Sequence, residues 1–339
     1  MLTGLDHIII GVYDLEQAEQ LFSQKLGLAV SGGGIHPSGG TANRIIVIGD
    51  TYIELIAVRT PEEAQQSMLE RLAKGEGYLN FVLSSDNIEA DTAAMEKRGI
   101  TIFGPTLGQL KSADGRTRGW KRTDIERPDL AQHYPFIIQH DSKGEERRTR
   151  LAGWKTPPRH PLGATQVLSA TIAVGDLGEA TRRFQHIYGL QPSESFTGEA
   201  DQWDAMLVAF PLGSQGAGEV ENIDGTPVVA QQSFELAVPL PFSVDPEVDD
   251  EYLPEPGALA RYLERLGEAT CRVTLAVQDL AAARRFLDEQ GVTYTYEERT
   301  EESIHPVVWI HPDYACGASI VLHEHDPRFV ISASGFPEE

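Results

Sequence analysis

The segment that decides the fold is Leu5–Leu28, with the sequence LDHIIIGVYDLEQAEQLFSQKLGL. Its apolar run IIIGV is short and rich in β-branched residues, which predicts a buried strand. Asp14 follows at the position of a helix N-cap, and apolar residues then recur along one helical face. Gly27 is placed to end that helix. The segment is therefore predicted to be a strand followed by a helix.

The same strand–helix pattern occurs four times along the chain. The copy at Leu168–Leu190, LSATIAVGDLGEATRRFQHIYGL, matches the first without a gap and has Asp176 in place of Asp14. Two further copies begin at Cys271 and, more weakly, at Tyr78. Further strand-like segments follow each copy. Internal repetition of this kind sets the architecture, so we predict an α+β fold of four βαβββ modules.

The length of the chain favours two domains. It has 339 residues, whereas a single core stops growing at roughly 250–300 residues, so each half is expected to bury its own core. A charged stretch with two consecutive prolines near position 157 predicts a linker without regular structure. We expect an N-terminal domain over 1–142, a linker over 143–165, a C-terminal domain over 166–326 and a tail over 327–339.

Composition excludes several classes of partner. The chain carries 51 acidic and 28 basic residues, a formal net charge of −23, and binding to nucleic acid or to an anionic membrane needs clustered Lys and Arg. The start of the chain runs directly into a strand pattern, and no apolar run approaches the roughly 20 residues of a membrane span. With only two cysteines and no CxxC motif, a cytoplasmic location is expected.

Paired βαβββ modules resemble the vicinal-oxygen-chelate superfamily. Within it, the N-terminal half is similar to the glyoxalase-like domain family in four segments: LDHIIIGVYDL, HPSGGTAN at His36–Asn43, YIELIAV at Tyr52–Val58 and YPFIIQ at Tyr134–Gln139. The resemblance implies two tandem glyoxalase-like domains, in each of which two modules curl into a cup around one site. It does not imply one reaction, because a single fold hosts many functions.

The resemblance also implies a metal site in the N-terminal domain. Members of the superfamily typically hold a divalent metal with His, Gln and Glu side chains on the first and last strands of each module. Carried over to this chain, those positions are His7 and Glu54 in the first module. In the second module Asn80 and Phe136 stand at the matching positions, so two of the four expected ligands are missing.

Two interpretations of His7 and Glu54 remain open at this stage. Imidazole and carboxylate suit Zn, Mn, Ni or Fe, and a third ligand could come from His36 or Asn80. Alternatively, the two side chains form a buried hydrogen-bonded pair that only stabilises the cup. In the C-terminal domain Ser169 and Arg272 replace the histidine, which predicts that this domain does not bind metal.

Other residues are candidates for catalysis and substrate binding. His36 lies in a glycine-rich loop and is a candidate acid/base catalyst. Glu54 is a candidate general base whose pKa burial is expected to raise. The candidate substrate-binding residues are Asn43, Asn80, Trp120, Arg122 and Phe136, the last three forming aromatic walls with one cation that suit a small organic acid or a planar ligand. Ordinary core packing is the competing interpretation of Trp120 and Phe136.

Two functions are therefore predicted for testing. One is a lyase or isomerase that acts on a small carbonyl- or vicinal-oxygen-containing molecule, with or without a divalent metal. The other is a metal-free protein that binds and sequesters a small molecule, as resistance proteins of the superfamily do. The C-terminal domain would be structural or would support a homodimer through its strand edges.

Overall fold

The computed structural model describes most of the chain. The described residues are 1–36, 38–111, 115–126, 134–156, 158–193, 196–198, 205–213, 220–221, 227–228, 232–240, 257–298 and 306–324. The predicted tail over 327–339 lies outside them. No helix in the described part of the chain is both long enough and apolar enough to cross a membrane.

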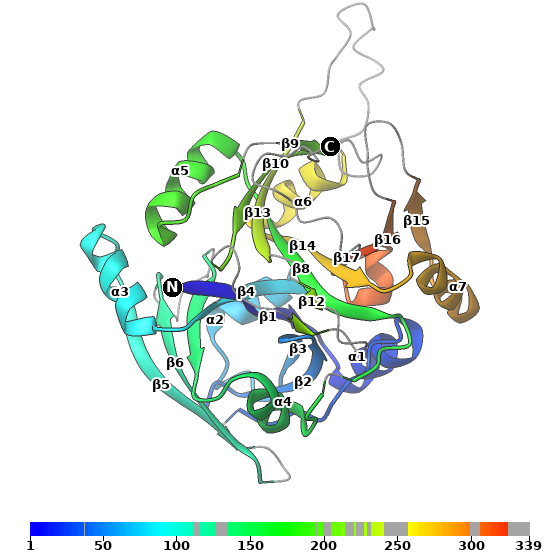
Figure 1. The fold of residues 1–339 in the computed structure, drawn as a ribbon, viewed down its shortest axis with the longest axis horizontal. Helices are drawn as coiled ribbons and strands as arrows, with labels where there is room; N and C mark the ends of the chain where they lie inside the picture. The colour runs from blue at the N-terminus through cyan, green and yellow to red at the C-terminus, as the bar shows by residue number, and fades with distance from the viewer. Residues whose placement is uncertain are drawn as a thin grey trace, which may run out of the picture.

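The N-terminal half forms one mixed sheet of seven strands (Figure 1). Its spatial order is β2-β3-β1-β4-β7-β6-β5, and β1 and β4, the first strands of the two modules, pair antiparallel at the centre. The strands are β1 (Leu2–Gly11), β2 (Thr41–Ile48), β3 (Thr51–Val58), β4 (Gly77–Ser85), β5 (Phe103–Lys111), β6 (Thr117–Asp124) and β7 (Phe136–His140).

The C-terminal half repeats this arrangement in an eight-stranded sheet, in the order β15-β16-β17-β14-β8-β13-β10-β9. Here β8 and β14 pair antiparallel at the centre, and β11 (Val220–Glu221) and β12 (Pro227–Val228) form a separate hairpin. The strands are β8 (Ala164–Ala173), β9 (Phe196–Gly198), β10 (Ala205–Pro211), β13 (Ser233–Pro239), β14 (Ala269–Val277), β15 (Tyr294–Glu297), β16 (Val307–Ile310) and β17 (Ser319–Glu324). The predicted α+β fold with four modules is confirmed.

Strand register confirms the predicted correspondence between modules. In each module the last strand pairs parallel with the first, and the position matching Glu54 lies opposite the residue two places after the position matching His7. The four pairs are Ile9↔Glu54, Val82↔Phe136, Thr171↔Glu235 and Thr274↔Val321. The positions compared in the sequence are therefore equivalent in space.

The helix after each first strand begins as predicted, because an Asp or Asn side chain caps it. These helices are α1 (Leu15–Gln20), α3 (Ile88–Lys97), α5 (Leu177–Tyr188) and α7 (Leu280–Gln290), with N-caps Asp14, Asn87, Asp176 and Asp279. A π-helical turn, Leu21–Lys25, extends α1. Gly189 and Gly291 end α5 and α7 in the left-handed conformation, which glycine adopts without steric cost.

The two halves do not bury separate cores, contrary to the sequence expectation. One hydrophobic cluster includes residues of both sheets and of α1, α3, α5 and α7. At its centre Phe234 of β13 stacks on Phe210 with 4.7 Å between ring centroids. Phe234 also lies 6.0 Å from Phe81 of the N-terminal sheet. The helix-bearing faces of both sheets therefore share one apolar interior.

The predicted linker contains a helix, so the expectation of no regular structure there is wrong. The helix is α4 (Gly144–Ala152), with Glu145 and Glu146 in its first turn, Arg150 in its last turn and Gly153 as its left-handed C-cap. These charges complement the helix dipole. Its buried residues Leu151 and Ala152 pack against Ile45, Val47 and Tyr52, which explains why the segment folds despite its charge.

The remaining face of the N-terminal sheet forms a cup. Its edge strand β5 approaches the loop before the opposite edge strand β2, since a Cβ added at Gly34 would lie 3.4 Å from Leu110. The first module lacks one full strand, and isolated bridges at Ser31 and Ile35 stand in its place. Helix α4 contacts β2 and β6 across the cup. The cup is therefore partly closed by a loop and a helix.

The shared core predicts that the two halves unfold together. Replacing Phe234 by Ala should lower the free energy of unfolding by about 3–5 kcal/mol, because a large aromatic side chain is lost from a site that contacts both sheets. Denaturant unfolding followed by circular dichroism should show a single transition at lower denaturant. Met206→Ala, at a side chain with 37% exposure, is the control and should cost less than about 1 kcal/mol. A second transition that the Phe234 variant leaves unshifted would contradict the shared core.

Candidate functional site

An irregularity in β1 places two adjacent side chains in the same network. The register of β1 against β4 shifts between Leu5 and His7, and such a bulge re-aims the side chain of the extra residue. Asp6 is consequently able to accept a hydrogen bond from His7 Nδ1, at 2.7 Å from its Oδ1. Both side chains are buried. The other ring nitrogen of His7, Nε2, faces the Glu54 carboxylate.

Two imidazoles converge on the carboxylate of Glu54. His7 Nε2 lies 3.7 Å from Glu54 Oε2, and His36 Nε2 lies 3.5 Å from Glu54 Oε1. Both separations exceed the usual hydrogen-bond range. The structure therefore brings together His7, His36 and Glu54, from β1, the glycine-rich loop and β3.

The orientation of His36 is set by β2. Its Nδ1 lies 2.7 Å from Thr41 Oγ1, and its backbone N–H donates to the Thr41 carbonyl. Asn43 is fully buried and donates from Nδ2 to Glu54 Oε1 at 2.5 Å, while its Oδ1 accepts from the backbone N–H of Gly34. Asn43 thus fixes both the catalytic candidate Glu54 and the loop that carries His36.

A second layer of contacts anchors Asp6 to the linker helix. Arg147 of α4 donates from Nη2 to Asp6 Oδ2 at 2.8 Å, and His140 Nε2 of β7 lies 3.2 Å from Asp6 Oδ1. Burial would raise the pKa of Asp6, but Arg147, His140 and His7 together hold it well below its usual range. Burial lowers the pKa of His140 despite the neighbouring Asp6. An ionised Asp6 therefore joins α4 to the floor of the cup.

The pKa of Glu54 differs from the sequence expectation. Burial alone would raise it, as predicted, but contacts with His36, His7 and Asn43 outweigh burial and lower the pKa to about 2. The expectation of a raised pKa is therefore wrong, because it took account of burial without the imidazoles and the amide that gather around the carboxylate. Glu54 is an anion at neutral pH.

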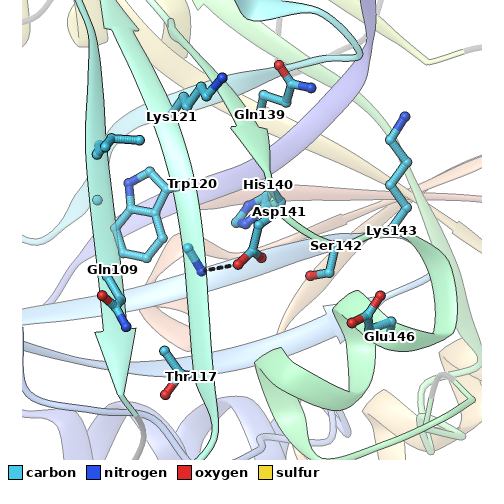
Figure 2. A pocket seen from close by; sticks show the side chains of 13 residues that line it. Gln109, Thr117, Trp120, Lys121, Gln139, His140, Asp141, Ser142, Lys143 and Glu146 are labelled. Carbon is cyan, nitrogen blue, oxygen red and sulfur yellow. Dashed lines mark hydrogen bonds between the residues drawn. The ribbon is translucent and has the colours of Figure 1, made fainter.

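A cleft of about 1030 Å³ is lined by residues of β5, β6, β7 and the start of α4, and Glu54 is not among them. Figure 2 shows Trp120 and His140 at this cleft. Trp120 and His140 line it with 6.3 Å between ring centroids. The Trp120 ring packs on the backbone of Gly108, where an added Cβ would lie 2.3 Å from Nε1. His140 contacts Asp6, and Asp6 contacts His7. His140 and Asp6 therefore connect the cleft to the cluster of His7, His36 and Glu54.

The other predicted substrate-binding residues, Phe136, Arg122 and Asn80, lie in different environments. Phe136 is buried and lies edge-on to the His7 ring, 6.1 Å between centroids. Arg122 sits 3.7 Å over the Phe136 ring and binds both carboxylate oxygens of Asp124. The amide of Asn80 is already bonded to the Tyr134 carbonyl and the Phe81 N–H. A substrate role stays a prediction for all three.

Sequence reasoning missed several residues of the site. Asp6 escaped notice because strict alternation would turn it away from His7, and Arg147 because it fell in the predicted linker. Tyr52, whose ring stacks on His7 with 4.6 Å between centroids, has no signal in the sequence beyond its place in the segment YIELIAV. Arg118, whose guanidinium carbon lies 6.0 Å from the centroid of the Tyr52 ring, alternates with Trp120 and Arg122 along β6, and this spacing is the signal that could have found it.

His7 Nε2 and Glu54 Oε2 could supply two of the four ligands that a metal site of this kind would need. Asp6 orients His7 in the way that second-layer carboxylates orient metal-binding histidines, and two acceptor atoms, His7 Nε2 and Glu54 Oε2, face each other. Yet no group of three or more His, Cys, Asp and Glu side chains in the described segments is placed to hold a metal ion. His7 and Glu54 therefore fit a metal only if other ligands complete the shell.

The equivalent position in the C-terminal sheet is differently occupied. Arg272 binds Glu235 with 2.8 Å between Nη2 and Oε2, and Thr171 donates to the same oxygen at 2.6 Å. Helix α6 (Ala258–Leu266) packs its apolar side chains against this face of the sheet, where Leu259 is buried beside Trp309 and Val321. This face is therefore filled by the protein's own helix and a neutralised ion pair.

The lowered pKa of Glu54 predicts acid sensitivity. A carboxyl with a folded pKa near 2 and an unfolded pKa near 4.5 stabilises the fold above about pH 4.5 and loses that contribution as pH falls toward 2. The contribution at neutral pH is on the order of 3 kcal/mol. In urea unfolding at pH 7, 5, 4 and 3, the stability difference between wild type and Glu54→Gln should shrink with falling pH. A difference independent of pH would contradict this, and exposed Glu62→Gln serves as the control.

Comparison with solved structures shows the fold over the whole chain. A crystal structure of a hypothetical protein from Staphylococcus aureus matches with a TM-score of 0.58 and 13% identity, covering 95% of this chain and 99% of that chain. A mutant 4-hydroxymandelate synthase from Streptomyces coelicolor matches with a TM-score of 0.57 and 12% identity. The match covers 98% of this chain and 96% of that chain. At these identities the likeness shows the arrangement of tandem domains and not the activity.

Sequence comparison identifies the family. No curated protein sequence matches the chain closely enough to count as a relative. Methylmalonyl-CoA epimerase from Mycobacterium tuberculosis is 24% identical over 49% of this chain and 91% of that chain, but its TM-score of 0.34 is too low to support an argument. The family model described as "Glyoxalase-like domain" matches residues 5–188, more than half of the chain. The protein therefore belongs to the glyoxalase-like domain family of the vicinal-oxygen-chelate superfamily.

Proposed function

We propose that the N-terminal cup is the active site of a lyase or isomerase that moves a proton next to a carbonyl group of a small substrate. The observation that carries the proposal is the approach of His7 Nε2 and His36 Nε2 to the two oxygens of the buried Glu54 carboxylate, at 3.7 and 3.5 Å. Side chains that serve only as a structural pair would be expected to close to hydrogen-bond distance.

His36 and Glu54 divide the work in this proposal. Glu54 is ionised and held by Asn43, so it stabilises positive charge on a neighbouring imidazole. His36 lies at the half-buried edge of the cup with 21% of its side chain exposed, where it can meet substrate and carry the proton. Its Nδ1 contact with Thr41 leaves Nε2 directed at the site.

A divalent metal is compatible with the same residues. His7 and Glu54 would hold it, and a bound metal would supply Lewis-acid polarisation of substrate oxygens. The chain's own contribution would be to orient His7 through Asp6, to hold Glu54 through Asn43 and to keep α4 over the cup through Arg147.

The second candidate function is sequestration of a small molecule without turnover. The substitutions Asn80 and Phe136 at two expected ligand positions favour it, as does the amide of Asn80, which is used within the strand and its neighbours. A sequestering protein would bind its ligand stoichiometrically and leave its chemical bonds intact.

Proton exchange tests the enzymatic proposal directly. Wild-type protein in D₂O should catalyse exchange of the proton beside the carbonyl in at least one member of a panel of 2-oxo and hydroxy-oxo compounds, followed by proton NMR. His36→Gln should slow the exchange by about 10²- to 10⁴-fold, the usual contribution of a general acid–base group. His186→Gln, at an exposed position on α5, should exchange like wild type. Equal rates in wild type and His36→Gln would exclude the assigned role.

Metal analysis tests the role of His7. If the cup holds a metal, elemental analysis of wild-type protein should find about one equivalent of Zn, Mn, Ni or Fe, and the double variant His7→Ala/Glu54→Ala should lose it, because both donor atoms are removed. If wild type holds no metal even after incubation with each ion, proton transfer by His36 and Glu54 alone, or sequestration, becomes the explanation to pursue.

A further inference from the structure

We infer that Arg118 is a carboxylate-binding residue and that the substrate class of the N-terminal cup is a small 2-oxo monocarboxylate. The inference rests on the proposed function for the direction of the chemistry, but the anion site itself is argued from Arg118 and its neighbours alone.

Arg118 belongs to a row of long side chains on one face of β6. Arg118, Trp120 and Arg122 alternate along the strand and so share a face, and Arg116 directly precedes the strand. Arg116 donates to the Thr149 carbonyl near the end of α4, and Arg122 is bound bidentately by Asp124. Both outer arginines therefore have protein acceptors.

The middle arginine is buried without an acceptor. Arg118 has 8% exposure, and its Nε and Nη1 atoms are buried with no hydrogen-bond partner among the residues described. A guanidinium remains charged at every ordinary pH. Burial of unpartnered N–H donors is costly, and such groups in native proteins require an explanation. An anion bound from solvent would supply the missing acceptors.

The surroundings favour a small planar anion. The guanidinium carbon of Arg118 lies 6.0 Å from the centroid of the Tyr52 ring and 5.9 Å from that of Trp120. The carboxylates of Asp6 and Glu54 already accept hydrogen bonds from Arg147 and Asn43, respectively. A single guanidinium fork between two rings matches one carboxylate, whereas a phosphate dianion would need further donors that this face of β6 has committed elsewhere.

The position of Tyr52 connects the anion site to the proposed catalytic group. Tyr52 and Glu54 are alternate residues of β3, so their Cα atoms are on the order of 7 Å apart on one face of the sheet. A carboxylate at Arg118 beside Tyr52 would thus leave the rest of a short acid to extend along the cup toward Glu54 and His36. By holding the carboxylate, Arg118 would orient the adjacent carbonyl carbon toward Glu54 and His36.

The test compares charged and neutral forms of one ligand by isothermal titration calorimetry. The probes are pyruvate and phenylpyruvate, each beside its methyl ester, with wild type, Arg118→Gln, Arg118→Lys and Arg284→Gln. Arg284 is the matched control, since its guanidinium stacks 3.6 Å over the Tyr296 ring in the other half of the chain. Circular dichroism establishes that each variant is folded before titration.

Wild type and Arg284→Gln should bind at least one acid about 10- to 100-fold more tightly than its ester, the range expected for a charge-assisted hydrogen-bonded pair. Arg118→Gln should lose that preference while its affinity for the ester stays within about threefold, and Arg118→Lys should retain part of it. Equal affinity of wild type for acid and ester, a preference that survives in Arg118→Gln, or no binding of either acid would each overturn the inference.

The proton-exchange and binding measurements separate the proposed function from the carboxylate site. If Glu54→Gln and His36→Gln lose proton exchange but keep the acid-over-ester preference, both assignments hold. If no protein exchanges protons yet the preference depends on Arg118, the carboxylate site stands and the cup sequesters organic acids instead of transforming them.

Discussion

The hydrogen bonds to the Asp6 carboxylate hold the candidate site together. One buried acid accepts from His7, His140 and Arg147, which come from the first strand of one module, the last strand of the next and the helix that follows both. This arrangement depends on the bulge in β1, because an unbroken strand would turn Asp6 away from the cup. Removing that acid would leave the Arg147 guanidinium without its buried counter-charge and the two imidazoles without their shared acceptor.

The N-terminal and C-terminal cups share one arrangement of strands but differ in the side chains that surround the equivalent glutamate. The first and last strands of their modules pair in the same register, and both carry a glutamate at the same position, Glu54 and Glu235. In the C-terminal cup the glutamate is neutralised by Arg272, and α6 fills the space with apolar side chains. In the N-terminal cup the glutamate faces imidazoles and an amide, and the covering helix α4 brings a charged residue, Arg147. The two covering helices therefore differ: α6 presents apolar side chains to its sheet, whereas α4 presents a charged one.

The apolar layer shared by the two sheets gives the site its rigid support. Phe234 and Phe81 join opposite halves of the chain within one cluster, so movement of one sheet would disturb the packing of the other. A carboxylate whose pKa is lowered in a buried site needs partners held at fixed distances. The C-terminal half thus contributes to the N-terminal site without supplying any of the residues proposed to act there.

The sequence determined the modules, their helix caps and the equivalence of His7, Asn80, Ser169 and Arg272, because these follow from local periodicity and from a repeat that copies itself along the chain. It also singled out His7, Glu54, His36 and Asn43, which lie together in space. Only the tertiary structure decided that Asp6 turns inward, that Arg147 and Arg118 reach the cup, and that Glu54 has a lowered pKa. Those properties depend on a bulge, on a helix packed from a distant segment and on the sum of burial and neighbouring charges, none of which has a period or a motif in the chain.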